Sequence, residues 1–404
     1  MKRTAALAVC AGLSVSSPVA AAAQEPARVL PIYLVPRDYP VPLERVVYHV
    51  RAMADVRQWY GRVLGGRTFV YEPLVVQVSR HPFAALAADS FQAWWPLLQD
   101  EFASYGWAWN HRAQFKLLFL TNGAGAWAGG DSENGGIDSV SQAGRVDKGN
   151  WGGLVVIGDS SVGGVLAGVC PEVSRGKADS AVATAWWCSG TTYRGTIAHE
   201  LGHTWGLPHP DAFRPRFRCA DTTAYTNMQC HWEYARERLL DYEILHLRSL
   251  DFFQFDTLPV WTLVARIEPV SGVGVRASRL ERGDSLVWVD GRGGGTGYPW
   301  AVVLDGSGAA VTYALPSGGG TLAFDLGIER GSRGSAALRI AADGQPLALI
   351  TAQAGSPPQR VVVPLGGAKR LGLRVVQGRG RMVLGNARVY RWSEDAPLPS
   401  TRNR

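Results

Sequence analysis

Long apolar stretches and runs of one charge are both rare in this sequence. Charged residues make up 19% of the chain and hydrophobic residues 46%, a balance typical of globular proteins and not of disordered ones. After the first 23 residues, no stretch approaches the roughly 20 apolar residues that a membrane helix needs. The net charge of +7 is spread along the chain, without a basic run or an aromatic nucleic-acid motif. We therefore expect no membrane span and no nucleic-acid partner.

The N-terminal segment 1–23 has the composition of a signal peptide. Two basic residues at positions 2 and 3 precede a short apolar run over 4–15, and three alanines end the segment at Ala23. We expect cleavage near Ala23 and export of the chain, either by secretion or to a periplasm. A chain of 404 residues is too long for one ordinary hydrophobic core, so we expect two domains after this segment.

Cysteine is scarce: only five occur, and Cys10 lies in the signal segment. The other four would remain after export, and an even number in an exported chain indicates disulfides: Cys170, Cys188, Cys219 and Cys230. Three pairings are open, and we favour the local one, Cys170–Cys188 with Cys219–Cys230, because it closes two short loops. Zinc ligation by cysteine is the alternative, but no pair has the two-residue spacing that such sites use.

The most informative stretch spans 196–210 and reads Thr-Ile-Ala-His-Glu-Leu-Gly-His-Thr-Trp-Gly-Leu-Pro-His-Pro. His199 and His203 are four residues apart, so a helix would place them on one face, where two imidazoles can bind one Zn²⁺. Glu200 lies between them and is placed to accept a proton from water held by that metal. The stretch therefore predicts a hydrolytic metal centre on a helix.

The residues after this helix extend the motif. Gly206 can end the helix in a left-handed turn, which lets His209 return as a third ligand. Three histidines leave one tetrahedral position for water, as in catalytic zinc sites. The alternative is an amphipathic core helix with two buried histidines. The opposite side of the helix does carry apolar residues that can pack: Ile197, Leu201 and Trp205.

The full pattern His-Glu-x-x-His-x-x-Gly-x-x-His resembles that of the metzincin clan of zinc endopeptidases. The resemblance implies an α+β catalytic domain over 24–254, with a twisted mixed sheet, an active-site helix and a methionine turn beneath the metal. Met228, in Thr-Asn-Met-Gln-Cys, is the methionine in range for that turn, where its thioether would pack under the histidine rings. Some metzincins place a tyrosine ligand two residues later. Cys230 stands there, so we do not expect that ligand.

Hydrophobic periodicity predicts the elements around this helix. We expect strands at 29–35, 67–79, 115–121 and 154–157, and helices at 44–64, 89–105 and 233–250. The resemblance implies that Gly125–Gly130 forms an edge strand that binds extended substrate, and a long surface loop is the alternative. Asp131, Glu133 and Asp138 carry carboxylates suited to Ca²⁺ but lack a full calcium-loop motif, so no calcium site is assigned.

The composition and the hydrophobic pattern of the sequence change at residue 255. Short Val, Leu and Ala strands alternate with Gly-rich turns, which predicts a β-sandwich or jelly roll over 255–392, followed by a tail at 393–404. Strand-and-turn patterns occur at Val311–Pro316, Leu322–Ile328, Ala337–Gly344 and Lys369–Val375. Through them the stretch 311–389 resembles the NPCBM family, a galactose-binding-like module, which implies a carbohydrate ligand. Trp288, Tyr298 and Trp300 are candidate sugar platforms, and the alternative is that they are core or edge residues of the sandwich.

We predict a secreted zinc endopeptidase that acts on a protein or glycoprotein. His199, His203 and His209 would hold Zn²⁺, and Glu200 would act as the general base. Two alternatives stay open. One is a zinc amidase that acts on peptidoglycan or a modified glycan, and the other is an inactive carbohydrate-binding surface protein. The intact Glu200 disfavours the second, because a relic site has no need of a base.

Overall fold

The computed structural model describes residues 28–86, 96–98, 100–101, 114–121, 126–129, 153–167, 190–209, 226–228, 238–250, 253–255, 261–280, 283–291, 294–315 and 320–392. The predicted signal segment, the four remaining cysteines, the calcium candidates and most of the helix expected at 89–105 lie outside these residues.

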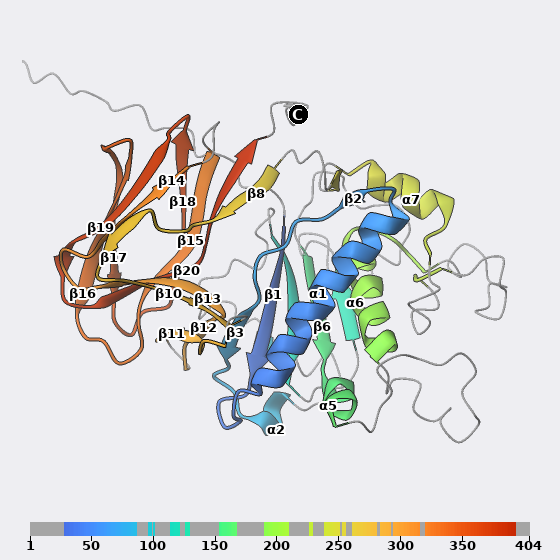
Figure 1. Cartoon of the computed structure of the whole chain (residues 1–404). Coiled ribbons are helices and arrows are strands. Elements are labelled where there is room, and N and C mark those ends of the chain that lie inside the picture. The colour runs from blue at the N-terminus through green and yellow to red at the C-terminus, as the bar shows by residue number, and fades with distance from the viewer. Residues whose placement is uncertain are drawn as a thin grey trace, which may run out of the picture.

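A mixed sheet of seven strands forms the first layer (Figure 1), in the order β11-β12-β3-β1-β4-β6-β5. The four central strands run parallel, and the strands at both edges run antiparallel to their neighbours. The members of the sheet are β1 (Arg28–Val35), β3 (Val75–Val78), β4 (Gln114–Leu120), β5 (Ala126–Gly129), β6 (Gly153–Gly158), β11 (Val287–Val289) and β12 (Thr296–Tyr298).

The strands of this sheet are apolar on both sides, so both faces are covered. Helices α1 (Leu43–Val63) and α6 (Gly190–Thr204) pack on one face, and Leu86 of α2 (Phe83–Leu86) packs with residues of the predicted sandwich on the other. In β1, Val29 and Tyr33 pack towards the helices, whereas Ile32 and Leu34 pack on the opposite face. The remaining elements of this layer are β2 (Arg67–Thr68), α5 (Ser160–Leu166), α7 (Asp241–Arg248) and β7 (Gln254–Phe255). The α+β class expected from the sequence is confirmed.

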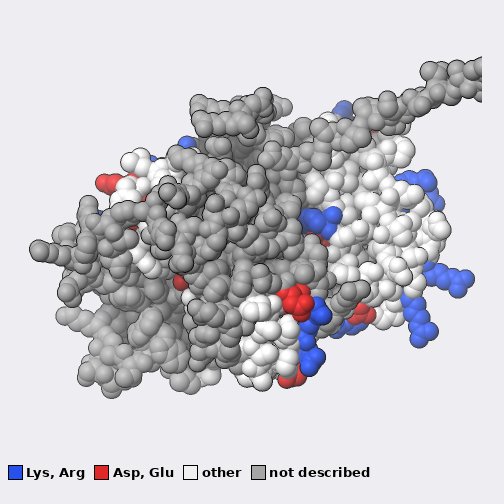
Figure 2. Space-filling model, turned by 180° about the vertical axis from the view of Figure 1, so that it is seen from behind, with Lys and Arg blue, Asp and Glu red and all other residues white. Residues whose placement is uncertain are grey.

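Two antiparallel sheets form the predicted β-sandwich. One has the order β10-β13-β20-β15-β18, with β8 also paired to β20, and the other has the order β17-β16-β19-β14-β9. Their bounds are β8 (Trp261–Arg266), β9 (Ser271–Val273), β10 (Val275–Arg279), β13 (Trp300–Asp305), β14 (Ala310–Ala314), β15 (Gly320–Ile328), β16 (Ser335–Ala342), β17 (Gln345–Gln353), β18 (Gln359–Gly366), β19 (Arg370–Gly378) and β20 (Arg381–Trp392). On the described surface in Figure 2, the Lys and Arg side chains are scattered over this sandwich.

The hairpin β11–β12 leaves the sandwich and extends the first sheet. It was expected among the sandwich strands, but Thr296 and Gly297 pair with Gln77 and Val76 of β3. A third apolar core lies between the two layers and includes Ala301, Val303 and Val383 from the sandwich. In space, therefore, a single cut after residue 254 does not separate the two sets of strands.

A buried cluster of charges also crosses this boundary. The Glu72 carboxylate lies 2.9 Å from Arg28 Nε, 3.4 Å from Arg360 Nη2 and 3.7 Å from Arg388 Nε. Arg28 and Glu72 are both fully buried, and Arg360 also contacts the partly buried Asp325 at 3.3 Å. Because Arg360 and Arg388 come from β18 and β20, the cluster ties the sandwich to the first sheet.

A second buried network holds the first strand, α1 and α6 together. Asp159, just after β6, accepts hydrogen bonds from Tyr33 Oη at 2.7 Å and Arg45 Nη1 at 2.9 Å. His49 Nε2 lies 3.4 Å from the same carboxylate, and Tyr193 Oη of α6 lies 3.3 Å from His49 Nδ1. Burial lowers the pKa of His49, so it is neutral at pH 7. Burial alone would raise the pKa of Asp159, but its partners outweigh burial and lower it.

The predicted strands and the long helix agree with the structure within one or two residues, apart from the irregular stretch between β2 and β3. The helix expected at 233–250 is shorter, because residues 238–240 are not helical and α7 begins at Asp241. Within the described residues, no helix combines the length and the apolar character that crossing a membrane requires.

The Glu72 cluster gives a test of stability. Glu72→Gln leaves Arg28 buried without its counter-charge, so we expect a loss of about 3–5 kcal/mol in the free energy of unfolding, measured by urea titration. Asp290→Asn is the control, because it breaks an exposed ion pair with Arg330 and should cost at most about 1 kcal/mol. Equal losses for the two variants would show that the buried cluster contributes no more to stability than an exposed ion pair.

Acid should weaken the Asp159 network. The pKa of Asp159 in the folded chain lies below the value of about 3.9 expected in an unfolded chain. The network therefore contributes stability above about pH 4 and loses it as the pH falls further. We expect Asp159→Asn to melt at a lower temperature than the wild type at pH 7, with a smaller gap at pH 3. A gap that is the same at both pH values would contradict this assignment.

Candidate metal centre

Helix α6 is held from behind by aromatic packing. Trp205, just past the helix, lies with its ring 5.1 Å from that of Tyr60, 5.2 Å from Phe69 and 4.8 Å from Phe253. The Tyr60 hydroxyl donates to the carbonyl of Ala198 at 2.6 Å. The apolar residues predicted to pack are indeed buried: Ile197, Leu201 and Trp205. The helix thus packs on one side and leaves the other side to the histidines.

The helix ends in a Schellman turn built on Gly206. Its φ of 91° is in the left-handed region that glycine favours. Leu207 N–H donates to Gly202 O at 3.0 Å, and Gly206 N–H donates to His203 O at 2.9 Å. The turn reverses the chain and brings His209 over the helix, as the sequence predicts.

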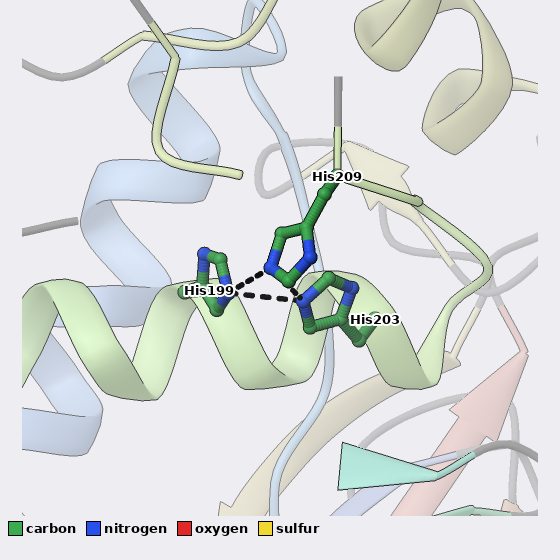
Figure 3. A group of neighbouring side chains, drawn as sticks. All are labelled: His199, His203 and His209. Atoms are coloured by element: carbon green, nitrogen blue, oxygen red, sulfur yellow. Dashed lines mark hydrogen bonds between the residues drawn. The ribbon is translucent and has the colours of Figure 1, made fainter. Parts of the chain in front are cut away.

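The three predicted ligands converge (Figure 3). The Nε2 atoms of His199 and His203 are 2.9 Å apart, those of His203 and His209 are 3.0 Å apart, and those of His199 and His209 are 3.1 Å apart. Ligand nitrogens on a tetrahedral zinc, at 2.0–2.1 Å from the metal, are about 3.3 Å apart. The triangle is therefore close to the size that one metal ion requires, and the group can hold a metal.

Two of these histidines have a tautomer set by their neighbours. His199 Nδ1 lies 2.8 Å from Asn227 O, and His203 Nδ1 lies 2.7 Å from Leu207 O. A carbonyl oxygen only accepts, so each Nδ1 must carry the proton, and each neutral ring presents a lone pair at Nε2. Two lone pairs 2.9 Å apart repel each other, and a cation between them removes that repulsion.

Glu200 lies on the turn between the two helical histidines and is nearly buried, whereas His209 is exposed. Burial raises the pKa of Glu200 to about 8. A nearby divalent cation acts in the opposite direction, because it favours the carboxylate. The centre therefore has a buried acid–base group on one side and an approach from solvent on the side of His209.

Met228 lies under the helix, as expected for the predicted methionine turn, and is fully buried. A Cβ atom added at Gly202 would lie only 2.5 Å from Met228 Sδ, so the sulfur packs directly against the helix between the two helical histidines. The neighbouring Asn227 donates from Nδ2 to Gly195 O at 3.1 Å, which ties this segment to α6. The zinc role of these residues stays a prediction.

The expected edge strand is present as β5, at the end of the sheet and antiparallel to β6. It also lies against α6, the helix that carries the histidines. Among the described residues, β5 has no partner on its outer edge. Its role in holding substrate stays a prediction.

The predicted sugar platforms are largely wrong. Tyr298 and Trp300 are buried, Tyr298 in the core between the layers and Trp300 in the core of the sandwich. Trp288 is half-buried, with its ring against Gly297 and the Arg330 guanidinium 4.5 Å from its centre. The alternative given above, that these are core or edge residues, fits the structure, because the hairpin β11–β12 docks onto the first sheet.

The sequence did not identify the two groups that set the histidine tautomers. Both are backbone carbonyls, of Asn227 and Leu207. Every residue has a backbone carbonyl, so the sequence does not show which ones accept these bonds. The remaining described histidines contact other residues of the fold. His49 is buried in the Asp159 network, His81 Nε2 lies 3.4 Å from Asp100 Oδ2, and His246 Nε2 lies 2.9 Å from Trp205 O.

No protein-family model matches the chain, and no curated protein matches it. Some solved structures are similar. Wild-type OgpA from Akkermansia muciniphila is 13% identical, with 95% of this chain and 96% of that chain covered and a TM-score of 0.34. Catalytically inactive OgpA in complex with an O-glycopeptide substrate is also 13% identical, with 90% and 94% covered and a TM-score of 0.32.

A third similar structure holds CBM51-2, in complex with GlcNAc, and the INT domains of ZmpB from Clostridium perfringens. It is 18% identical, with 33% of this chain and 32% of that chain covered and a TM-score of 0.29. The present chain thus spans about a third of that ZmpB chain. Likenesses at these TM-scores carry no argument about activity.

The contact between Gly202 and Met228 gives a test. Gly202→Ala places a methyl group against the buried Met228 sulfur, so we expect a loss of about 1–3 kcal/mol in the free energy of unfolding. Gly61→Ala in α1 is the control, because its added Cβ has only one neighbour, at 3.9 Å, and alanine favours a helix by about 1 kcal/mol. Urea titration of both variants checks this, and a Gly202→Ala variant as stable as Gly61→Ala would contradict it.

Proposed function

We propose that this chain is an exported zinc endopeptidase whose metal is held by His199, His203 and His209. One observation carries the proposal: the three Nε2 atoms lie within 3.1 Å of one another, while carbonyl partners turn two of the lone pairs inwards. Neutral imidazoles are ligands that Zn²⁺ prefers, and a three-histidine set leaves a position for chemistry. The resemblance of the motif to the metzincin pattern agrees with this assignment.

When bound, zinc supplies Lewis acidity towards a carbonyl oxygen and lowers the pKa of water to about 7. The chain supplies the proton transfers. The Glu200 carboxylate accepts a proton from the water that attacks the peptide carbonyl and then delivers this proton to the leaving amine. Its burial supports this role, because a carboxylate removed from bulk water is more basic than an exposed one.

The substrate proposed is a protein or glycoprotein in extended form. The outer edge of β5, which has no strand partner among the described residues, lies beside α6 and supports this. A peptide can add to such an edge through backbone hydrogen bonds while its side chains select for sequence. O-glycosylated peptides belong among the first substrates to test, because the sequence of the sandwich resembles a carbohydrate-binding family. A carbohydrate ligand for the sandwich stays a prediction from the sequence.

The role of Glu200 predicts a specific loss. Glu200→Gln should keep stoichiometric zinc but reduce peptide hydrolysis by about 10²–10⁴-fold, because the amide cannot accept the proton. Zinc content by elemental analysis and cleavage of a peptide library by mass spectrometry measure both quantities. Glu44→Gln, the same change on the exposed first turn of α1, is the control and should alter neither.

Removal of zinc by a chelator should also stop cleavage, and added zinc should restore it. The substrates to compare are casein, an O-glycosylated peptide, a mucin-type glycoprotein and peptidoglycan. Cleavage of peptidoglycan alone would favour the amidase, and stoichiometric zinc without hydrolysis of any substrate would favour the inactive binding protein. Full activity of zinc-loaded Glu200→Gln would remove Glu200 from its role.

A further inference from the structure

A buried carboxylate outside the zinc motif is connected to the metal centre. Glu243 of α7 is fully buried, and its Oε2 atom accepts the Thr226 hydroxyl at 2.6 Å and the Leu240 N–H at 2.7 Å. The bond from Leu240 is a helix-capping contact, which accounts for an acid near the start of α7. The bond from Thr226 is not a capping contact, because it reaches 17 residues back to the segment under the zinc helix.

From Thr226 the contacts continue to a metal ligand. The Thr226 oxygen accepts the N–H of Met228 at 3.3 Å. That N–H belongs to the same peptide unit as the carbonyl of Asn227, and this carbonyl accepts His199 Nδ1–H at 2.8 Å. A trans peptide points its N–H and its C=O to opposite sides, so the two bonds form one continuous path through the peptide plane.

We propose that Glu243 is a positioning residue for the metal centre, acting on His199 through the Thr226 hydroxyl and the Asn227–Met228 peptide. The proposal rests on the zinc site proposed above. Metal-binding histidines commonly donate their second N–H to a carboxylate or a carbonyl, which fixes the ring and raises its basicity. Here the two devices are joined in series: the carbonyl touches the ring, and the carboxylate polarises the carbonyl from the far side of the peptide.

The direction of every bond in this path agrees. Glu243 accepts, Thr226 donates to it and accepts from Met228, and the peptide accepts from His199. Bonds aligned in this way strengthen one another, by roughly 10–30% per bond. Burial raises the pKa of Glu243 to about 7, and the bonds from Thr226, Leu240 and Tyr242 act against burial and favour the carboxylate.

The test compares two buried glutamates with the same kinds of partner. Glu101 accepts the Ser79 hydroxyl and the Arg80 N–H and is 3% exposed, but these two bonds lead to no metal ligand. We expect Glu243→Gln to weaken zinc binding by about 10–100-fold, measured by competition with a chelating dye, and Glu101→Gln to leave it unchanged. In the cobalt-loaded protein, the visible absorption band should shift for Glu243→Gln alone.

A second pair of variants keeps the test sharp if Glu243→Gln does not fold. Thr226→Val removes the hydroxyl at nearly constant volume and should weaken zinc binding, whereas Thr226→Ser keeps the hydroxyl and should restore it. Unchanged zinc affinity and an unchanged cobalt spectrum in both Glu243→Gln and Thr226→Val would overturn the proposal, whatever happens to their stability.

The outcome is separable from that of the proposed function. Wild-type protein that binds zinc tightly but hydrolyses no peptide would refute the endopeptidase, and a weakened Glu243→Gln would still support the path to His199. Wild-type protein that hydrolyses peptides, with zinc affinity unaltered in Glu243→Gln, would refute the path and leave the endopeptidase standing.

Discussion

Convergence of three imidazole nitrogens is the constraint on which the rest of the first domain depends. Nε2 atoms about 3 Å apart, with two of their lone pairs turned inwards, are unfavourable without a cation. The surrounding residues must therefore hold these rings in place against the repulsion between the lone pairs. The Schellman turn at Gly206 supplies the carbonyl for His203 and returns His209, while the 226–228 segment supplies the carbonyl for His199.

The packing of α6 supplies free energy that offsets this repulsion. The face opposite the histidines is buried among aromatic rings of α1 and the neighbouring strands, and burial of such side chains contributes about 1.5–3 kcal/mol each. Hydrogen bonds from Tyr60 to the helix and from His246 to the carbonyl of Trp205 restrict its sliding and rotation. The helix is thus fixed by apolar contacts, and the polar face is left for chemistry.

The sequence predicts local features well and tertiary ones poorly, for a physical reason. The spacing of His199, His203 and His209 is set by one helix and one turn, so it can be read directly. The strands follow from apolar runs of suitable length. By contrast, Tyr298 looks like any aromatic at a strand end, and only the pairing of β12 with β3 shows why it is buried.

Glu243 is an intermediate case between these two. Glu243 and Leu247 are four residues apart on α7 and both are buried, so the acid takes a place on the apolar side of the helix. An acid at such a place is a signal that can be read from sequence, because a buried carboxylate requires donors. The identity of those donors cannot be read, since Thr226 lies on another segment and its hydroxyl meets Glu243 only after folding.

The boundary between sequence domains differs from the boundary between packed layers. Composition changes at residue 255, yet β11 and β12 pair with the first sheet and Glu72 contacts arginines of the sandwich. Separating the layers would expose the third apolar core and leave fully buried charges such as Arg28 without part of their environment. Opening this contact would cost free energy, so the sandwich is better regarded as packed firmly against the first layer than as a module on a free linker. The sandwich therefore lies at a fixed position relative to the three histidines.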